Sequence, residues 1–142
     1  MISEQLVDLS RLQFTLIDFS LETLKYTQQK IEEAAAEHRV KVDVSYVQES
    51  VHELLKRATR DTAPADGEGF DTIYCAGLFD YLSDKVCSRM IRYFMSRSNP
   101  GAHLLVTNVH ADNPERYGME HLLEWHLIYR DEKQMLSVME EV

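Results

Sequence analysis

The sequence predicts an α/β fold in which helices cover a largely parallel sheet. Two observations predict it: strand-like and helix-like segments alternate along the chain, and most strand-like segments are continuous apolar runs. Strands that alternate with helices form parallel units, and such strands are apolar because helices cover both faces of their sheet. From residue 13 onward the expected order is β-α-β-α-β-α-β-(α)-β-α.

The length and composition are those of one globular domain, and we expect a single domain over residues 1–142. The chain has 44% hydrophobic and 27% charged residues, and no apolar run is long enough to span a membrane. Its net charge of −9 argues against nucleic acid as a partner and fits a neutral or cationic small-molecule substrate. We therefore expect no nucleic-acid and no membrane partner.

The N-terminal sequence has no basic region followed by an apolar stretch, so we expect no signal peptide and a cytoplasmic location. The only two cysteines, Cys75 and Cys87, have no paired spacing. They indicate a reducing compartment with neither a disulfide framework nor a zinc site.

The first half of the chain predicts two strand–helix units. After a short helix over 2–10, the apolar run 13–19 predicts a strand, and Ser20 is expected to cap a helix to about Glu37. Residues 40–47 alternate apolar and polar side chains, which indicates a half-exposed edge strand. The elements expected next are a helix over 51–60 and a surface loop over 61–69.

The segment 69–82, GFDTIYCAGLFDYL, is the centre of the predicted sheet. The apolar run 70–75 predicts a strand that is buried on both faces. Ala76 and Gly77 follow it, and their lack of bulk lets a ligand or another chain segment approach the backbone closely. The carboxyl end of such a strand is where open α/β sheets bind ligands.

The second half predicts a helix from Ser83, with an apolar stripe through Cys87 and Met90, that ends at the turn residues 99–101. The remaining expected elements are a strand over 102–109, a helix starting at 113–114, a strand over 124–130, and a last helix capped by Asp131 with Gln134. Four strand ends would then meet at one edge of the sheet: 18–19, 48–50, 75–77 and 108–110. An acid at such an end, here Asp18, suits the two hydroxyls of a ribose.

Four segments in this order, TLIDFSLETLKYTQQKI, VDVSYVQES, FDTIYCAGLFDYLSD and NPGAHLLVTNV, resemble successive motifs of class I S-adenosylmethionine-dependent methyltransferases. The resemblance covers nearly the whole chain from Gln13 onward. It implies a Rossmann-like methyltransferase fold, a three-layer sandwich with a mostly parallel sheet, and S-adenosylmethionine as cofactor. The family's glycine-rich loop and first strand have no counterpart before Asp18, and its last strand has none before Val142. We therefore expect an incomplete version of that fold.

The resemblance also implies a set of cofactor-binding residues in the first half. Asp18 would bind the ribose hydroxyls, and Phe19 would flank the adenine. Glu49 would stand at the adenine edge, with Gln48 and Ser50 beside it.

The cofactor-binding residues implied in the second half follow the central strand. Cys75, Ala76 and Gly77 would lie against the methionine part of the cofactor. Leu78 and Phe79 would close the pocket.

Methyl transfer mainly requires an acceptor that is aligned with the sulfonium methyl group. His110, Asp80 and Tyr129 are the candidates for a general base, although polar residues at strand ends more often serve the backbone. The four histidines between residues 103 and 126 match no ligand spacing, so we expect no metal site.

These observations lead to two main hypotheses. The first is a truncated methyltransferase domain that acts on a small-molecule or lipid-like acceptor. The alternative is a catalytically silent α/β module that keeps the fold and serves interaction or dimerisation. A receiver-type signalling domain with Asp18 as phosphoacceptor fits less well, because the chain lacks the further acids and the lysine that such a site needs.

The missing first strand has a consequence for assembly. It would leave two unpaired strand edges, and exposed edges pair with other strands. We therefore expect either that the two sets of strands close on each other or that two chains form a homodimer.

Overall fold

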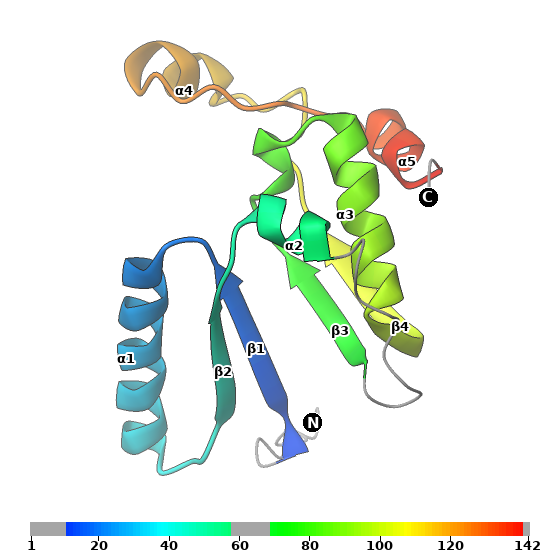
Figure 1. Cartoon of the computed structure of the whole chain (residues 1–142). Coiled ribbons are helices and arrows are strands. Elements are labelled where there is room, and N and C mark those ends of the chain that lie inside the picture. The colour runs from blue at the N-terminus through cyan, green and yellow to red at the C-terminus, as the bar shows by residue number, and fades with distance from the viewer. Residues whose placement is uncertain (1–10, 58–68, 141–142) are drawn as a thin grey trace, which may run out of the picture. The chain divides into compact units, whose positions relative to one another are not determined.

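The computed structural model describes residues 11–57 and 69–140 (Figure 1). The chain consists of two compact units that divide after Arg57. We describe each unit by itself. The predictions for residues 2–10 and for most of the 61–69 loop lie outside the described residues.

The first unit is a parallel βαβ unit followed by a short helix. Strand β1 (Gln13–Asp18) pairs in parallel with β2 (Asp43–Gln48), and helix α1 (Leu21–His38) connects them. The register runs from Gln13 opposite Asp43 to Asp18 opposite Gln48, so both carboxyl ends lie at the same edge. The predicted strand–helix–strand order of this half is confirmed.

Helix α1 begins where the sequence predicts it. Ser20 is its N-cap, and the Ser20 hydroxyl accepts a hydrogen bond from the Thr23 N–H at 3.2 Å. The helix ends at Arg39, which adopts a left-handed conformation with φ 53° and lets its N–H bond to the carbonyl of Ala36. Leu24 is the buried side chain of this helix.

Strand β2 shows the alternation that the sequence predicts. Val44 and Tyr46 are half-buried, whereas Asp43 and Ser45 are exposed. Helix α2 (Val51–Arg57) follows, with Leu54 and Leu55 buried. The three residues by which the predicted helix extends beyond Arg57 lie outside the described residues.

The second unit repeats the parallel arrangement. Strand β3 (Phe70–Cys75) pairs in parallel with β4 (Ser98–Val106), and helix α3 (Asp84–Ser96) connects them. A single turn of 3-10 helix, η2 (Phe79–Tyr81), precedes α3. Ser83 is the N-cap of α3, as the sequence predicts.

The core of this unit lies between α3 and the last helix, α5 (Glu132–Glu140). Helix α3 buries Cys87 and Met90, which belong to the predicted apolar stripe, and it also buries Ile91. Val138 of α5 is 2% exposed, and its carbonyl accepts a hydrogen bond from the Ser88 hydroxyl at 3.0 Å. Figure 1 shows α3 and α5 side by side, in agreement with this contact.

The prediction that the 70–75 strand is buried on both faces is wrong. Its bounds match β3, but Tyr74 is 64% exposed and Phe70 is exposed as well. Only Ile73 and Cys75 are half-buried within the strand. The apolar run marks a strand, but burial of its two faces requires helices packed on both of them, and the side chains of β3 are largely exposed.

The turn predicted at residues 99–101 is also wrong. These residues belong to β4, where two steps along β3, from Phe70 to Thr72, correspond to five steps along β4, from Ser98 to His103. The extra residues form an irregularity in the ladder, and Gly101 has φ 81° within it. The turn-forming residues are therefore accommodated as a bulge.

The strand predicted over 124–130 does not form. That segment is irregular, and its backbone makes one parallel bridge, between His110 and Arg130. The Ile128 N–H donates to the carbonyl of Asp80 in η2 at 2.7 Å, so a single 3-10 turn rather than a strand satisfies it. Glu124 has φ 51°, which interrupts an extended conformation.

The two helices predicted near the C-terminus are present. Helix α4 (Arg116–Leu122) starts two residues after Pro114, and Asp131 with Gln134 forms the predicted capping pair of α5. The described strands form two separate two-stranded sheets, both parallel. The structure thus confirms an α/β chain with parallel strands.

Candidate functional site

Polar and aromatic side chains gather at the carboxyl ends of β1 and β2. Asp18 is the last residue of β1 and lies opposite Gln48, the last residue of β2. Phe19 follows Asp18, and its ring is 75% exposed. The Gln48 side-chain amide donates to the carbonyl of Phe19 at 3.2 Å, which ties the two strand ends together. The structure therefore brings these three predicted residues to one edge.

The Asp18 carboxylate is half-buried and already has a local partner. Its Oδ1 accepts a hydrogen bond from the Ser20 N–H at 2.7 Å. The bond holds the carboxylate against the first turn of α1. Since a carboxylate has about four acceptor sites, the group can accept further donors while keeping this bond.

Glu49 lies beside this edge in an ion pair. Its Oε2 is 3.0 Å from Nη1 of Arg57, without the alignment of a hydrogen bond, and its side chain is 13% exposed. A ligand that approaches Glu49 would therefore meet a carboxylate whose charge Arg57 partly balances.

Ser50 is the N-cap of α2 in the structure. Its hydroxyl accepts from the Glu53 N–H at 3.3 Å, and the Glu53 carboxylate accepts from the Ser50 N–H at 2.7 Å. The backbone N–H of Ser50, and then its hydroxyl, lower the pKa of Glu53. These bonds form a capping box, so the hydroxyl of Ser50 serves the helix.

The carboxyl ends of β3 and β4 form the corresponding edge of the second unit. Cys75 lies opposite Val106, and Gly77 has φ 70° in the turn that follows β3. The Gly77 N–H donates to the Thr107 hydroxyl at 3.0 Å. Ala76 and Gly77 are exposed, and no heavy atom lies within 4 Å of a Cβ added at Gly77. The small-residue opening that the sequence predicts is present.

The thiol of Cys75 is a weak acid in this setting. Burial, and then the nearby Cys87 thiol, raise the pKa of Cys75 from 9.0 to about 11. The thiol therefore remains protonated at neutral pH and is a poor nucleophile.

Leu78 and Phe79 differ in accessibility. Leu78 is half-buried, whereas Phe79 is fully buried in the core of the second unit. A side chain that is already enclosed by protein atoms cannot line an open site without a rearrangement. In this structure Phe79 is a packing residue.

The three candidates for a general base differ in accessibility too. Asp80 is 5% exposed, and its Oδ1 accepts from the Val109 N–H at 2.6 Å. The hydroxyl of Tyr129 is buried without a hydrogen-bond partner in the described part of the chain, and the Arg116 guanidinium lies 4.6 Å from the centre of its ring. Both arrangements favour structural roles.

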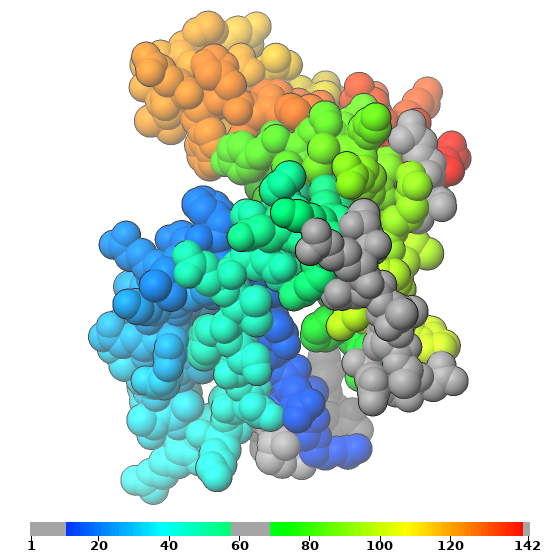
Figure 2. Space-filling view, in the orientation of Figure 1, coloured from blue at the N-terminus to red at the C-terminus, as the bar shows by residue number. Residues whose placement is uncertain are grey.

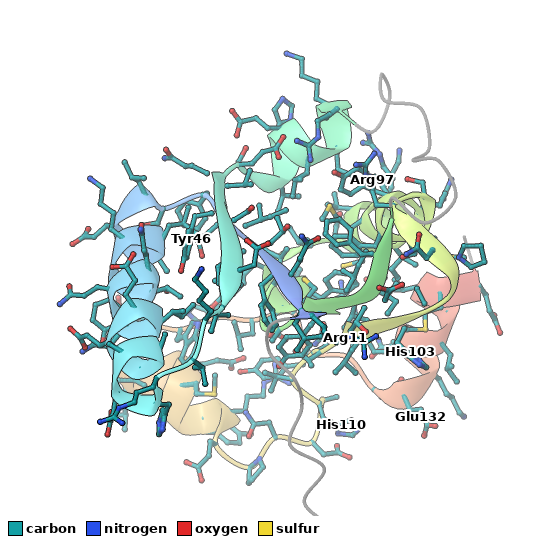
Figure 3. All side chains as sticks on the ribbon, turned by 90° about the horizontal axis from the view of Figure 1, so that it is seen from below. Arg11, Tyr46, Arg97, His103, His110 and Glu132 are labelled. Atoms are coloured by element: carbon teal, nitrogen blue, oxygen red, sulfur yellow. The ribbon has the colours of Figure 1, made fainter. Side chains whose placement is uncertain are left out.

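His110 is the accessible candidate. More than half of its side chain is exposed, and its Nδ1 accepts from the Asp112 N–H at 3.1 Å. In the neutral ring Nε2 then carries the proton, and the lone pair of Nδ1 is occupied by the Asp112 N–H. Figure 3 shows His110 and His103 well apart. In residues 11–57 and 69–140, no group of three His, Cys, Asp or Glu side chains could hold a metal ion.

Arg130 is the residue that sequence reasoning missed. It is 3% exposed, and its guanidinium bonds to side chains and carbonyls of the loops that follow β3 and β4. The sequence carried one signal for it: Arg130 stands at the end of the apolar segment 124–130. An arginine that is buried with such a segment requires several hydrogen-bond partners, so it marks a network.

Comparison of the chain with protein-family models, with curated proteins and with solved structures gave no significant match. None of the helices within the described ranges combines the length and apolarity needed to cross a membrane.

Proposed function

We propose that this chain is part of an S-adenosylmethionine-dependent methyltransferase domain and that the carboxyl ends of β1 and β2 recognise the adenosine part of the cofactor. One observation carries the proposal: Asp18 and Phe19 lie together at that edge, one a half-buried carboxylate and the other an exposed ring. Gln48 links the second strand end to the same backbone.

The chemistry of this edge suits a nucleoside. A carboxylate accepts hydrogen bonds from both ribose hydroxyls, and charged hydrogen bonds are about twice as strong as neutral ones. An exposed aromatic ring such as Phe19 offers a face on which a purine can stack. The cofactor itself supplies the methyl group, and the protein supplies binding and orientation.

The acceptor of the methyl group is proposed to be a small or lipid-like molecule. His110 is the accessible residue that could remove a proton from it, once its Nδ1 gives up the bond to the Asp112 N–H. Asp80 is held by a hydrogen bond and Tyr129 by the Arg116 guanidinium. The remaining cofactor contacts, at Glu49, Cys75 and Leu78, are part of the same proposal.

Calorimetric titration of the full chain with S-adenosylmethionine and S-adenosylhomocysteine tests the proposal. We expect saturable binding that Asp18→Ala weakens by about ten- to a hundredfold, the equivalent of 1.5–3 kcal/mol for hydrogen bonds to a charged group. Asp43→Ala is the matched control, because it removes an exposed carboxylate from the opposite end of the strands.

Two results would contradict the proposal. Wild-type protein that binds neither ligand at millimolar concentration has no cofactor site. Binding that Asp18→Ala and Asp43→Ala weaken equally would point to a general effect of charge rather than to recognition of ribose.

A second candidate function is an interaction module that keeps the fold without catalysis. The observation that favours it is the exposure of large apolar side chains on α4 and just after it: Leu122 is 83% exposed, Tyr117 76% and Leu123 68%. Figure 2 shows the atoms of this segment in orange. Exposed apolar groups of this kind mark association surfaces. Self-association without cofactor binding would favour this candidate.

A further inference from the structure

The guanidinium of Arg130 is enclosed within the second unit and makes five hydrogen bonds. Nε and Nη2 both donate to Oδ1 of Asp84, at 2.9 and 2.6 Å. Nη1 donates to the carbonyl of Phe79 at 2.8 Å and to Oδ1 of Asn108 at 2.6 Å, and Nη2 donates to the carbonyl of Leu82 at 2.6 Å. A guanidinium has five N–H donors, so this pattern uses each of them.

The partners of Arg130 belong to two loops that follow neighbouring parallel strands. Phe79, Leu82 and Asp84 lie between the end of β3 and the first turn of α3. Asn108 lies in the loop after β4, and the carbonyl of Val109 in the same loop accepts from the Arg130 N–H at 3.2 Å. One side chain thus joins both loops at the carboxyl edge of this sheet.

The Asp80 side chain and a second bond of Asn108 complete the network. Oδ1 of Asp80 accepts from the Val109 N–H at 2.6 Å, and this bond joins the two loops directly. The Asn108 amide donates to the carbonyl of Ile128 at 2.9 Å, while the Ile128 N–H donates to the carbonyl of Asp80 at 2.7 Å. The segment around Ile128 is therefore bound to both loops through its backbone.

The arrangement requires arginine. Lysine carries three donors at a single point and cannot reach acceptors on several sides of a planar fork. A buried charge is costly unless it is paired and hydrogen-bonded, and Asp84 supplies the opposite charge here. Any change at this position therefore leaves loop carbonyls without donors.

We infer that Arg130 is a positioning residue, which holds the loops after β3 and β4 in the geometry needed to bind a ligand at that edge. The inference rests on the proposed function and extends it from the adenosine part of the cofactor to the amino-acid part. Cys75 ends β3, and the loop after it begins with Ala76 and Gly77; the proposed function assigns these three residues to that part. Protein acceptors use all five guanidinium donors of Arg130, so its effect on a ligand would act through the loops.

The test compares two ligands on the full chain, S-adenosylhomocysteine and adenosine, which lacks the amino-acid part. Titrations are made well below the onset of thermal unfolding of each variant. We expect Arg130→Lys to weaken S-adenosylhomocysteine binding by about tenfold and adenosine binding by less than about twofold, since loss of loop order affects one part of the ligand. Arg116→Lys, at a half-exposed position on α4 that pairs with Glu120, should change neither.

A change that only damaged the fold would weaken both ligands equally, and this result overturns the inference. Unchanged binding of both ligands overturns it as well. If Arg130→Lys fails to fold, Asp84→Ala replaces it, because the Asp84 side chain is largely exposed and its loss frees two of the five bonds. Wild-type protein that binds neither ligand overturns the proposed function and this inference with it, whereas binding by wild type with no effect at Arg130 overturns the inference alone.

Discussion

Gly69 lies where the chain has no room for a side chain. A Cβ at this position would stand 2.9 Å from the Arg97 carbonyl oxygen, the Asn99 nitrogen and Oδ1 of Asn99. Two of these atoms are backbone atoms and cannot move aside. The Asn99 side-chain amide also accepts from the Gly69 N–H and donates to the Gly69 carbonyl, each at 2.9 Å. These two bonds hold the two backbone segments at this short distance.

We therefore expect Gly69→Ala to lower the free energy of unfolding by about 1–3 kcal/mol, the usual cost of overpacking. Urea denaturation followed by circular dichroism measures it. Gly118→Ala is the matched control, because it lies in α4 with nothing within 4 Å of the added Cβ. That control should be neutral or stabilising by up to about 1 kcal/mol. Equal effects at both positions would show that crowding at Gly69 is relieved by local movement.

Cys75 makes the stability of the protein depend on pH in the alkaline range. Burial, and then the Cys87 thiol, raise its pKa from 9.0 to about 11, so the folded protein holds the thiol proton more tightly than the unfolded chain does. The contribution of this group is complete below pH 9 and is lost as the pH rises to about 11.

We expect the wild type to lose more stability between pH 8.5 and about 10.5 than Cys75→Ala does, because the variant lacks the titrating thiol. Urea denaturation at several pH values measures both curves. The difference between the curves isolates Cys75 from lysines and tyrosines that titrate in the same range. Parallel curves would contradict a raised pKa at this thiol.

Among the secondary-structure elements, α5 shows how a local signal supports a long-range contact. Asp131 and Gln134 satisfy each other's backbone N–H groups at 2.8 and 2.9 Å, which forms the first turn. The helix then buries Val138 against α3, where Ser88 bonds to its carbonyl. The cap therefore stabilises an element that completes the core of the second unit.

Asp131→Ala should lower the free energy of unfolding by about 1 kcal/mol, because it leaves the Gln134 N–H without its acceptor. Thermal or urea denaturation measures the change, and hydrogen exchange at Val138 should increase with it. Lys133→Ala, in the first turn of the same helix, is the control. A similar loss in the control would mean that the first turn of α5 is stabilised by something other than its cap.

Two other elements show where element-scale reasoning from sequence ends. The residues Asn99, Pro100 and Gly101 are typical of a turn, and β4 nevertheless includes them because Asn99 bonds to Gly69, 30 residues away. The apolar segment 124–130 is typical of a strand, but loop groups satisfy its backbone. In both segments the partner, and not the local pattern, decides the conformation.

At the scale of the whole molecule, exposed apolar side chains are the feature that bears on assembly. They occur on α4 and just after it, and also on both two-stranded sheets, where Phe14 and Tyr74 are exposed. Strands with one described neighbour also present backbone groups at their other edge. A homodimer through strand edges, or through α4, therefore remains a proposal for this chain.

We expect the purified chain to associate as its concentration rises into the range of tens of micromolar, and we expect Leu122→Glu to weaken that association about tenfold or more. Burying one leucine contributes about 1.5–3 kcal/mol, and a charge cannot replace it. Sedimentation velocity over a range of concentrations measures the change. Tyr26→Glu, an exposed aromatic on α1, is the control.

If Tyr26→Glu and Leu122→Glu both leave association unchanged, the strand edges are the better candidates for the contact. A monomer at all concentrations would contradict both forms of the homodimer and would weaken the interaction-module hypothesis.

The sequence alone determined the features that depend on neighbouring residues. The alternation of strands and helices, the caps at Ser20 and Asp131, and the small-residue turn at Gly77 were all predicted, because each follows from propensities and hydrogen bonds within a few positions. The placement of Asp18 beside Gln48 followed as well, since parallel strands of equal length bring their carboxyl ends together.

Only the tertiary structure decided the features that depend on distant partners. The network of Arg130 joins residues 22 to 51 positions apart, and no local pattern in the apolar segment around it indicates those acceptors. The exposure of β3 and the inclusion of Asn99 in β4 have the same origin, because a strand's burial and bounds are set by what lies beside it. The free energy of a buried charge or an unpaired backbone group depends on its surroundings in space, and these are specified by the chain as a whole.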